Sequence, residues 1–125
     1  MGAVMLLGGC SALRTRAPAP SGISAGFEQT GEASWYGAQR QGRLTASGQP
    51  YDMYKLTAAS MTLPLMSRAR VTNLDDGRSV VVLINDRGPN AAGRIIDLSY
   101  AAAQAIGMVQ RGVARVRVTV LSVPG

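Results

Sequence analysis

Residues 80–99 read Val-Val-Val-Leu-Ile-Asn-Asp-Arg-Gly-Pro-Asn-Ala-Ala-Gly-Arg-Ile-Ile-Asp-Leu-Ser, in which two β-branched apolar runs flank a polar turn. The first run, residues 80–84, shows no alternation with polar residues. Such a run is typical of a strand in the centre of a barrel or sandwich, where both faces of the strand are buried. The stretch therefore predicts a mainly β protein with a central strand that leads directly into a polar loop.

The polar turn begins at the end of this strand with Asn85, Asp86 and Arg87. Gly88 and Pro89 then end the strand, because proline lacks a backbone N–H and glycine adopts dihedral angles closed to other residues. An ionisable residue where a buried strand meets a loop is held on a rigid support, which favours a functional site. Ordinary turn chemistry is the alternative interpretation of the same residues.

Outside this stretch, short strands are predicted over residues 32–37, 68–74, 78–85, 94–98 and 113–121. In the last of these, valines alternate with polar residues, as expected for a strand with one buried face. The Asp-Gly pair at residues 76–77 predicts a hairpin turn, since both residues tolerate a positive φ. Ser99 is suited to cap an alanine-rich helix over residues 100–106, with Gly107 at its end. Short strands with one helix favour a small closed barrel.

The composition limits the chemistry available to the chain. Its 125 residues are enough for one domain with a modest core. The chain has no histidine and one cysteine, Cys10, which excludes imidazole chemistry, an intramolecular disulfide and a thiolate metal site. No apolar run reaches the roughly 20 residues that a membrane-spanning helix needs. We therefore expect neither a metal nor a cofactor.

The chain is basic, with 13 Lys and Arg residues against 7 Asp and Glu residues and a formal net charge of +6. A charge of this sign is compatible with nucleic acid as a partner. The arginines are scattered, however, aromatic residues are few, and no nucleic-acid-binding motif is present. We therefore expect no nucleic-acid partner, and a monomer whose charges mostly keep its surface solvated.

The N-terminal segment differs from the rest of the chain. Residues 1–10 form a short apolar stretch that ends in Leu-Gly-Gly-Cys, which is similar to the lipobox of bacterial lipoproteins. We interpret them as a truncated lipoprotein signal peptide with Cys10 as the lipidated mature N-terminus; an irregular N-terminus with a chance cysteine is the alternative. Residues 11–30 are rich in Ser, Ala, Pro and Gly and should form a tether, so the folded domain is expected over residues 31–122.

Several further segments carry a family signature. In order, they are Ala-Ser-Trp-Tyr-Gly (33–37), Gly-Arg-Leu-Thr-Ala-Ser-Gly (42–48), Thr-Ala-Ala (57–59), Leu-Pro (63–64), Val-Thr-Asn (71–73), Asn-Asp-Arg-Gly-Pro (85–89) and Gly-Arg-Ile-Ile-Asp-Leu-Ser (93–99). Together they resemble the rare lipoprotein A family over residues 31–121. That family consists of bacterial septal lipoproteins, and the resemblance implies a small six-stranded double-psi β-barrel with one or two short helices.

The resemblance also implies a function. Lytic transglycosylases are lyases that cleave the bond between N-acetylmuramic acid and N-acetylglucosamine without water and leave 1,6-anhydromuramyl ends. The expected substrates are the glycan strands of peptidoglycan, and the enzyme is expected to prefer strands that lack stem peptides. The expected role is cell-wall organisation at the septum, by a protein held through the lipid on Cys10 in the outer membrane and facing the periplasm.

Family resemblance places three functional positions in the groove of the barrel, of which only Asp86 matches. Asp86 would act first as general acid and then as general base, because the nucleophile is the substrate's own C6 hydroxyl. Gln49 stands where the family has Glu, and Ser60 stands where it has His. Gln49 can still bind a hydroxyl but cannot carry a proton. The alternative function is therefore a catalytically impaired, glycan-binding envelope lipoprotein.

Contacts with the glycan are expected from Gln49, Ser60, Asn85, Arg87, Arg43 and Tyr36. Tyr36 could stack on a sugar ring, although its place in the first strand fits the core equally well. The two arginines could bind N-acetyl or carboxylate groups, with Arg87 directed away from Asp86. Asp52 could be a second carboxylate of the site, but a structural role in a turn is the favoured interpretation.

Overall fold

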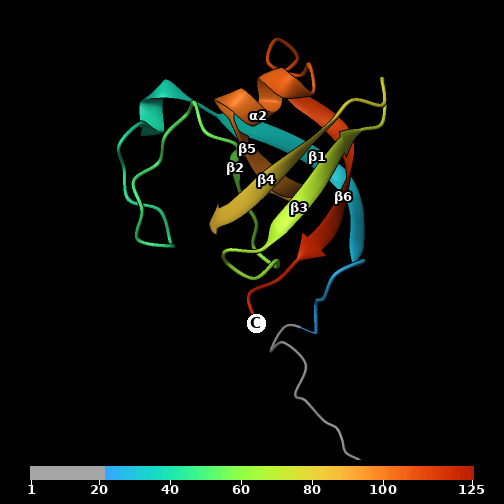
Figure 1. Ribbon diagram of the computed structural model, residues 1–125. Helices are drawn as coiled ribbons and strands as arrows, with labels where there is room; N and C mark the ends of the chain where they lie inside the picture. The colour runs from blue at the N-terminus through green and yellow to red at the C-terminus, as the bar shows by residue number, and fades with distance from the viewer. Residues whose placement is uncertain (1–21) are drawn as a thin grey trace, which may run out of the picture.

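A computed structural model describes residues 22–125 and shows a closed barrel of six strands (Figure 1). In chain order the elements are β1 (Glu28–Tyr36), the 3-10 helix η3 (Ala38–Arg40), β2 (Thr57–Ala59), β3 (Arg68–Asn73), β4 (Ser79–Asp86), β5 (Arg94–Ser99), α2 (Tyr100–Ala105) and β6 (Val113–Ser122). The mainly β fold with one or two short helices is confirmed. The predicted signal peptide with Cys10, and the predicted tether up to residue 21, lie outside the described residues.

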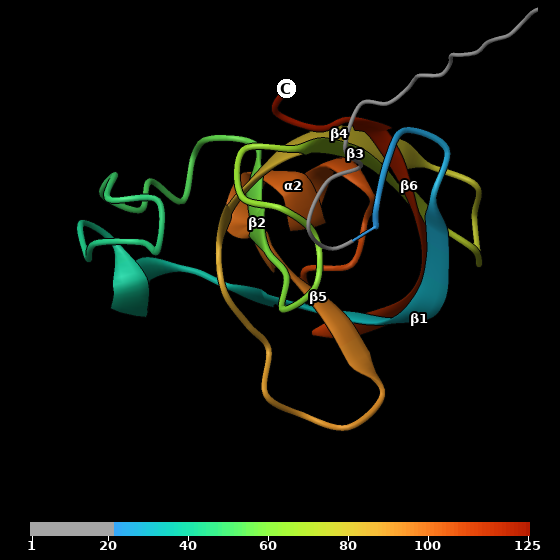
Figure 2. The same ribbon diagram turned by 90° about the horizontal axis from the view of Figure 1, so that it is seen from below.

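The strands follow the order β1-β5-β2-β4-β3-β6 around the barrel, and β6 closes it against β1. Neighbours are antiparallel except for two parallel pairs, β1 with β5 and β2 with β4. Seen along the barrel, the segment between η3 and β2 projects to one side of it (Figure 2). We call residues 37–56 the site loop. Among the described strands closure leaves no free edge, so a ligand cannot bind by adding a strand and must contact strand ends, loops or outer faces.

The core is built from the inward face of each strand. The alternation predicted for β6 is confirmed, because Val116, Val118 and Val120 are at most 1% exposed while Arg115 and Arg117 face outward. The short helix α2 lies across one end of the barrel and contributes Ala102 and Ala103 to the core (Figure 1). Its predicted cap is also confirmed, since the Ser99 hydroxyl accepts the N–H of Ala102 at 3.2 Å.

The hairpin predicted at residues 76–77 joins β3 to β4, which pair antiparallel with Val71 opposite Val80. Gly77 has a φ of 80°, a conformation that glycine adopts without steric cost. No helix within residues 22–125 is both long enough and apolar enough to cross a membrane.

The prediction that residues 80–84 are buried on both faces is wrong. Val82 and Ile84 are fully buried, but Val81, on the opposite face of β4, is 38% exposed. The wall of a closed barrel has one inward face, and little covers the outward face of β4 at this point. The apolar run therefore reflects the preference of β-branched residues for strands as well as burial.

Ordered structure begins earlier than expected. β1 starts at Glu28, inside the segment predicted to be a tether, and Ile23 from the same segment is 6% exposed and belongs to the core. The first residues of β1 are polar and show no apolar alternation. Backbone pairing with β6, which sets Glu28 opposite Thr119, holds them in the strand.

Candidate functional site

The carboxylate of Asp86 stands at the end of β4, partly exposed and beside the site loop. Its Oδ1 accepts the backbone N–H of Ala46 at 2.9 Å and the N–H of Arg87 at 2.8 Å. Within residues 22–125, Oδ2 has no hydrogen-bond partner and the carboxylate enters no ion pair. One oxygen is therefore fixed by the backbone, and the other is available to a ligand.

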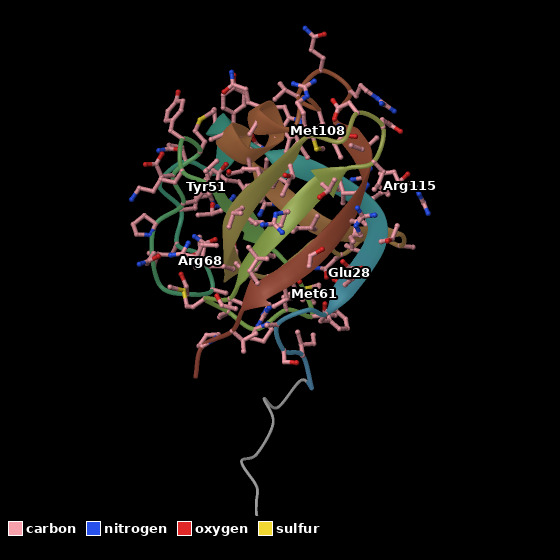
Figure 3. The ribbon with its side chains drawn as sticks, turned by 45° about the vertical axis from the view of Figure 1, so that its right-hand side comes forward. Glu28, Tyr51, Met61, Arg68, Met108 and Arg115 are labelled. Atoms are coloured by element: carbon pink, nitrogen blue, oxygen red, sulfur yellow. The ribbon has the colours of Figure 1, made fainter. Side chains whose placement is uncertain are left out.

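The site loop is tied to the barrel next to this carboxylate. The N–H of Ser47 donates to the carbonyl of Asn85 at 3.1 Å. Tyr51, which Figure 3 places where the loop meets the barrel, is 2% exposed. Its hydroxyl donates to the carbonyl of Tyr36 at 2.7 Å and accepts the N–H of Tyr100 at 3.3 Å. These bonds hold the loop at a set position relative to Asp86.

A pocket of about 370 Å³ lies between the site loop and the outer faces of β2 and β4, lined by Gln49, Pro50, Asp52, Lys55, Thr57, Leu83 and Asn85. Thr57 and Asn85 are 8% and 4% exposed, and Thr57 Oγ1 and Asn85 Oδ1 have no hydrogen-bond partner in the described part of the chain. Buried polar atoms are normally satisfied, so two such atoms at one pocket indicate a ligand or water position. Asp86 does not line the pocket but follows Asn85 directly.

Tyr36 does not offer a surface for stacking on a sugar, and of its two interpretations the structure agrees with a place in the core. It is 3% exposed, its ring lies 4.7 Å from that of Tyr51, and the Arg40 guanidinium lies 4.9 Å from its centre. Burial raises the pKa of the Tyr36 hydroxyl well above its ordinary value, and the negative charge of Asp86 raises it further. The phenol therefore stays protonated, as a buried neighbour of the Asp86 carboxylate.

Ser60 likewise has no surface with which to contact a substrate, in contrast to the expectation from the sequence. The residue is fully buried. Its hydroxyl accepts the N–H of Thr62 at 3.2 Å and the N–H of Leu63 at 3.0 Å. Ser60 thus stabilises the turn that follows β2.

Replacing Ser60 by Ala should lower the free energy of unfolding by about 1–3 kcal/mol, because the two N–H groups lose their acceptor. The expected readout is a shifted midpoint in chemical denaturation, with glycan cleavage per folded molecule unchanged. Ser79→Ala, an exposed serine on β4, is the matched control and should shift the midpoint little. Unchanged stability with reduced cleavage in Ser60→Ala would assign the residue to the substrate after all.

The remaining candidates are distributed around Asp86. Arg87 points away from it, as expected, since its Nη1 donates to the carbonyls of Ser60 at 2.7 Å and Leu63 at 2.6 Å. Arg43 is exposed on the site loop, and its side chain makes no hydrogen bond or ion pair with residues 22–125. Asp52 has a turn role, because its Oδ1 accepts the N–H of Tyr54 at 3.0 Å, and it also lines the pocket.

Two polar residues of the pocket, Lys55 and Thr57, were not predicted from the sequence. Thr57 falls within the Thr-Ala-Ala motif, but nothing in the sequence shows that β2 pairs with β4 and brings Thr57 opposite Leu83.

The described residues contain no group of three or more carboxylate, imidazole or thiol side chains that could hold a metal ion. What this end of the barrel offers is acid–base and hydrogen-bonding chemistry by side chains.

Comparison with known proteins agrees with this geometry. The profile of the lytic transglycolase family matches residues 28–118, which include every strand of the barrel except the end of β6. The chain belongs to the lytic transglycolase family. Among curated members, the "endolytic peptidoglycan transglycosylase RlpA" of Vibrio cholerae is 58% identical over 98 residues, or 78% of this chain and 37% of that protein. The protein of the same name from Neisseria meningitidis serogroup A is 52% identical over 106 residues, or 85% of this chain and 44% of that protein.

This lytic transglycolase chain thus spans less than half the length of these curated relatives. Among solved structures, the Streptomyces papain inhibitor superposes with a TM-score of 0.64 at 23% identity, over 79% of this chain and 98% of that chain. The expansin of Clavibacter michiganensis gives 0.61 at 18% identity, over 79% and 52%. The double-psi β-barrel implied by the sequence is confirmed.

Proposed function

We propose that this chain is an endolytic peptidoglycan lytic transglycosylase with Asp86 as its general acid and base. The observation that carries the proposal is the state of the Asp86 carboxyl group: Oδ1 is held by two backbone N–H groups, and Oδ2 has no partner among residues 22–125. The names of the curated relatives, and a family profile that covers the barrel, support the same activity.

The reaction needs only one carboxyl group from the protein. Protonated Asp86 would donate its proton to the glycosidic oxygen as the bond from C1 of N-acetylmuramic acid to that oxygen breaks. The C6 hydroxyl of the same muramyl residue then attacks C1, and its proton passes to the Asp86 carboxylate. The products are a 1,6-anhydromuramyl end and a free 4-hydroxyl on N-acetylglucosamine. No water is consumed, in contrast to hydrolysis, where a second carboxylate activates water or attacks directly.

The biological setting follows from this substrate. Because its substrate is peptidoglycan, the protein would act in the bacterial cell envelope, with glycan strands as its partner. The family resemblance implies a preference for strands that lack stem peptides. A lipid on Cys10 would hold it in the outer membrane, facing the periplasm, and residues 11–21 would let the barrel reach the cell wall. We also propose that it acts as a monomer in cell-wall organisation at the septum.

Gln49, Asn85 and Arg43 are proposed to position the glycan around Asp86, whereas the Arg87 guanidinium points away from Asp86 to the carbonyls of Ser60 and Leu63. Gln49 and Asn85 line the pocket next to it, and Arg43 is exposed on the same loop. The neutral amide of Gln49 suits hydrogen bonding to a sugar hydroxyl but cannot move a proton. The proposal therefore assigns all proton transfer to Asp86.

The test is to incubate the full chain with glycan strands stripped of stem peptides and to follow strand length by size-exclusion chromatography. An endolytic enzyme should shorten the mean strand length early, because it cuts within strands. Strands that co-sediment with the protein but keep their length would contradict the proposal and favour the catalytically impaired, glycan-binding alternative.

A further inference from the structure

The pocket lined by Asn85, the residue before Asp86, carries a combination of groups that the proposed reaction does not use. Its lining includes Thr57 and Asn85, whose Oγ1 and Oδ1 atoms are buried and have no partner in residues 22–125. It also includes Lys55, which is exposed and is the only lysine of the chain. A cation and two unsatisfied oxygens in one lining favour a ligand that brings an anion together with N–H or O–H donors.

Lys55 is available for such an anion. The Lys55 ammonium group enters none of the ion pairs in the described part of the chain. Those pairs join Arg78 to Asp76, Arg94 to Glu32 and Arg111 to Asp75. The backbone of Lys55 is nevertheless well fixed, since its carbonyl accepts the hydroxyl of Ser99 at 2.6 Å and the N–H of Thr57 at 3.1 Å. The side chain therefore extends from a rigid base.

The one acid in the pocket, Asp52, is partly engaged by the loop. Its Oδ1 accepts the N–H of Tyr54 at 3.0 Å and the side-chain amide of Gln41 at 3.5 Å. No ion pair within 4.0 Å joins it to Lys55. Asp52 thus leaves the ammonium group to an external anion and offers an acceptor for a sugar hydroxyl.

We propose that this pocket binds one muramyl residue and that Lys55 recognises its free lactyl carboxylate. This inference rests on the proposed function, and it names the residue that would distinguish a peptide-free muramyl residue from one that bears a stem peptide. A muramyl residue without a stem peptide carries a carboxylate, an N-acetyl N–H and ring hydroxyls, which match Lys55, Asn85 Oδ1 and Thr57 Oγ1. In a residue that bears a stem peptide, the same carboxyl is an amide and has no charge. The volume of about 370 Å³ lies at the low end of the range of about 300–1,000 Å³ for ligand pockets, as expected for a single sugar subsite.

The test measures equilibrium binding by calorimetry, so that it does not depend on cleavage. The full chain is titrated with peptide-free glycan oligomers and with the same oligomers after conversion of the lactyl carboxylates to methylamides. Lys55→Gln should weaken binding of the carboxylate form about 10- to 100-fold, the size expected for a charge-assisted hydrogen bond. It should leave binding of the methylamide form unchanged, and Lys55→Arg should retain part of the preference.

Arg117→Gln is the matched control, since it removes an exposed positive charge from the outer face of β6, a strand that borders neither β2 nor β4. If Arg117→Gln lost as much affinity as Lys55→Gln, the effect would be general electrostatics and the subsite would be overturned. Equal binding of both oligomers by the unmodified chain, or no binding of either, would also overturn it. A chain that discriminates through Lys55 but never shortens strands would instead uphold the subsite and contradict the proposed enzyme.

Discussion

Replacing Asp86 by Asn is expected to lower the rate of glycan cleavage by about 100- to 10,000-fold, the usual contribution of a positioned acid–base group. The Asn carbonyl can still accept the N–H groups of Ala46 and Arg87, which hold Oδ1 in the structure. The fold and the glycan affinity should therefore persist while the transferable proton is lost. Initial rates of anhydromuramyl end formation, followed by liquid chromatography and mass spectrometry, measure the effect.

The matched control for this change is Asp75→Asn. Asp75 lies in the β3–β4 turn, exposed and paired with Arg111, so its replacement removes one negative charge far from the site loop. Cleavage by Asp75→Asn should remain close to that of the unmodified chain. Loss of less than about tenfold in Asp86→Asn would show that another group supplies the proton, since about tenfold corresponds to only 1.4 kcal/mol of barrier.

Truncating Ile84 to Ala is expected to lower the free energy of unfolding by about 2–5 kcal/mol. Ile84 is fully buried and lies on β4 two positions before Asp86, with Ala58 of β2 as its parallel neighbour. Removing its outer carbons leaves a cavity in the barrel. The surrounding strands are paired on both sides and can relax into that cavity only in part. The midpoint of urea denaturation, monitored by tryptophan fluorescence, measures the loss.

Val81→Ala on the same strand is the comparison that makes this result specific. Val81 faces outward and is 38% exposed, so its truncation should cost less than about 1 kcal/mol. Similar losses for the two variants would mean that the outward face of β4 is covered after all. Such a result would restore the two-sided burial that the apolar run alone predicted.

The parts of the fold that depend on local patterns were predictable. The alternation in β6, the Asp-Gly hairpin and the Ser99 cap each rest on a few neighbouring residues. Which strands become neighbours depends on pairings between distant residues, and no local period encodes these. The double-psi topology therefore came from family resemblance. The start of β1 at Glu28 was missed for the same reason, since its polar residues are held by β6.

The site was predictable to a smaller degree. The strand end followed by Gly-Pro pointed to Asp86 as a supported polar residue or a turn residue, and its acid–base role came from the family resemblance. Among residues 22–125, only Oδ1 of its carboxylate has hydrogen-bond partners. The burial of Ser60 and Tyr36 could not be read from residue type, since both types occur in cores as well as in sites. Lys55 and Thr57 join the site through the path of the site loop and the β2–β4 pairing.

The most direct test of the account is cleavage of peptide-free glycan strands by the full chain in water enriched in ¹⁸O, followed by mass spectrometry of the new ends. Attack by the substrate's own C6 hydroxyl, with Asp86 moving the proton, predicts ends that are one water lighter than a reducing sugar and carry no label. New reducing ends formed in place of anhydro ends would show hydrolysis, and strands without new ends would show no cleavage. Either result would contradict a transglycosylase built on the single carboxyl group of Asp86.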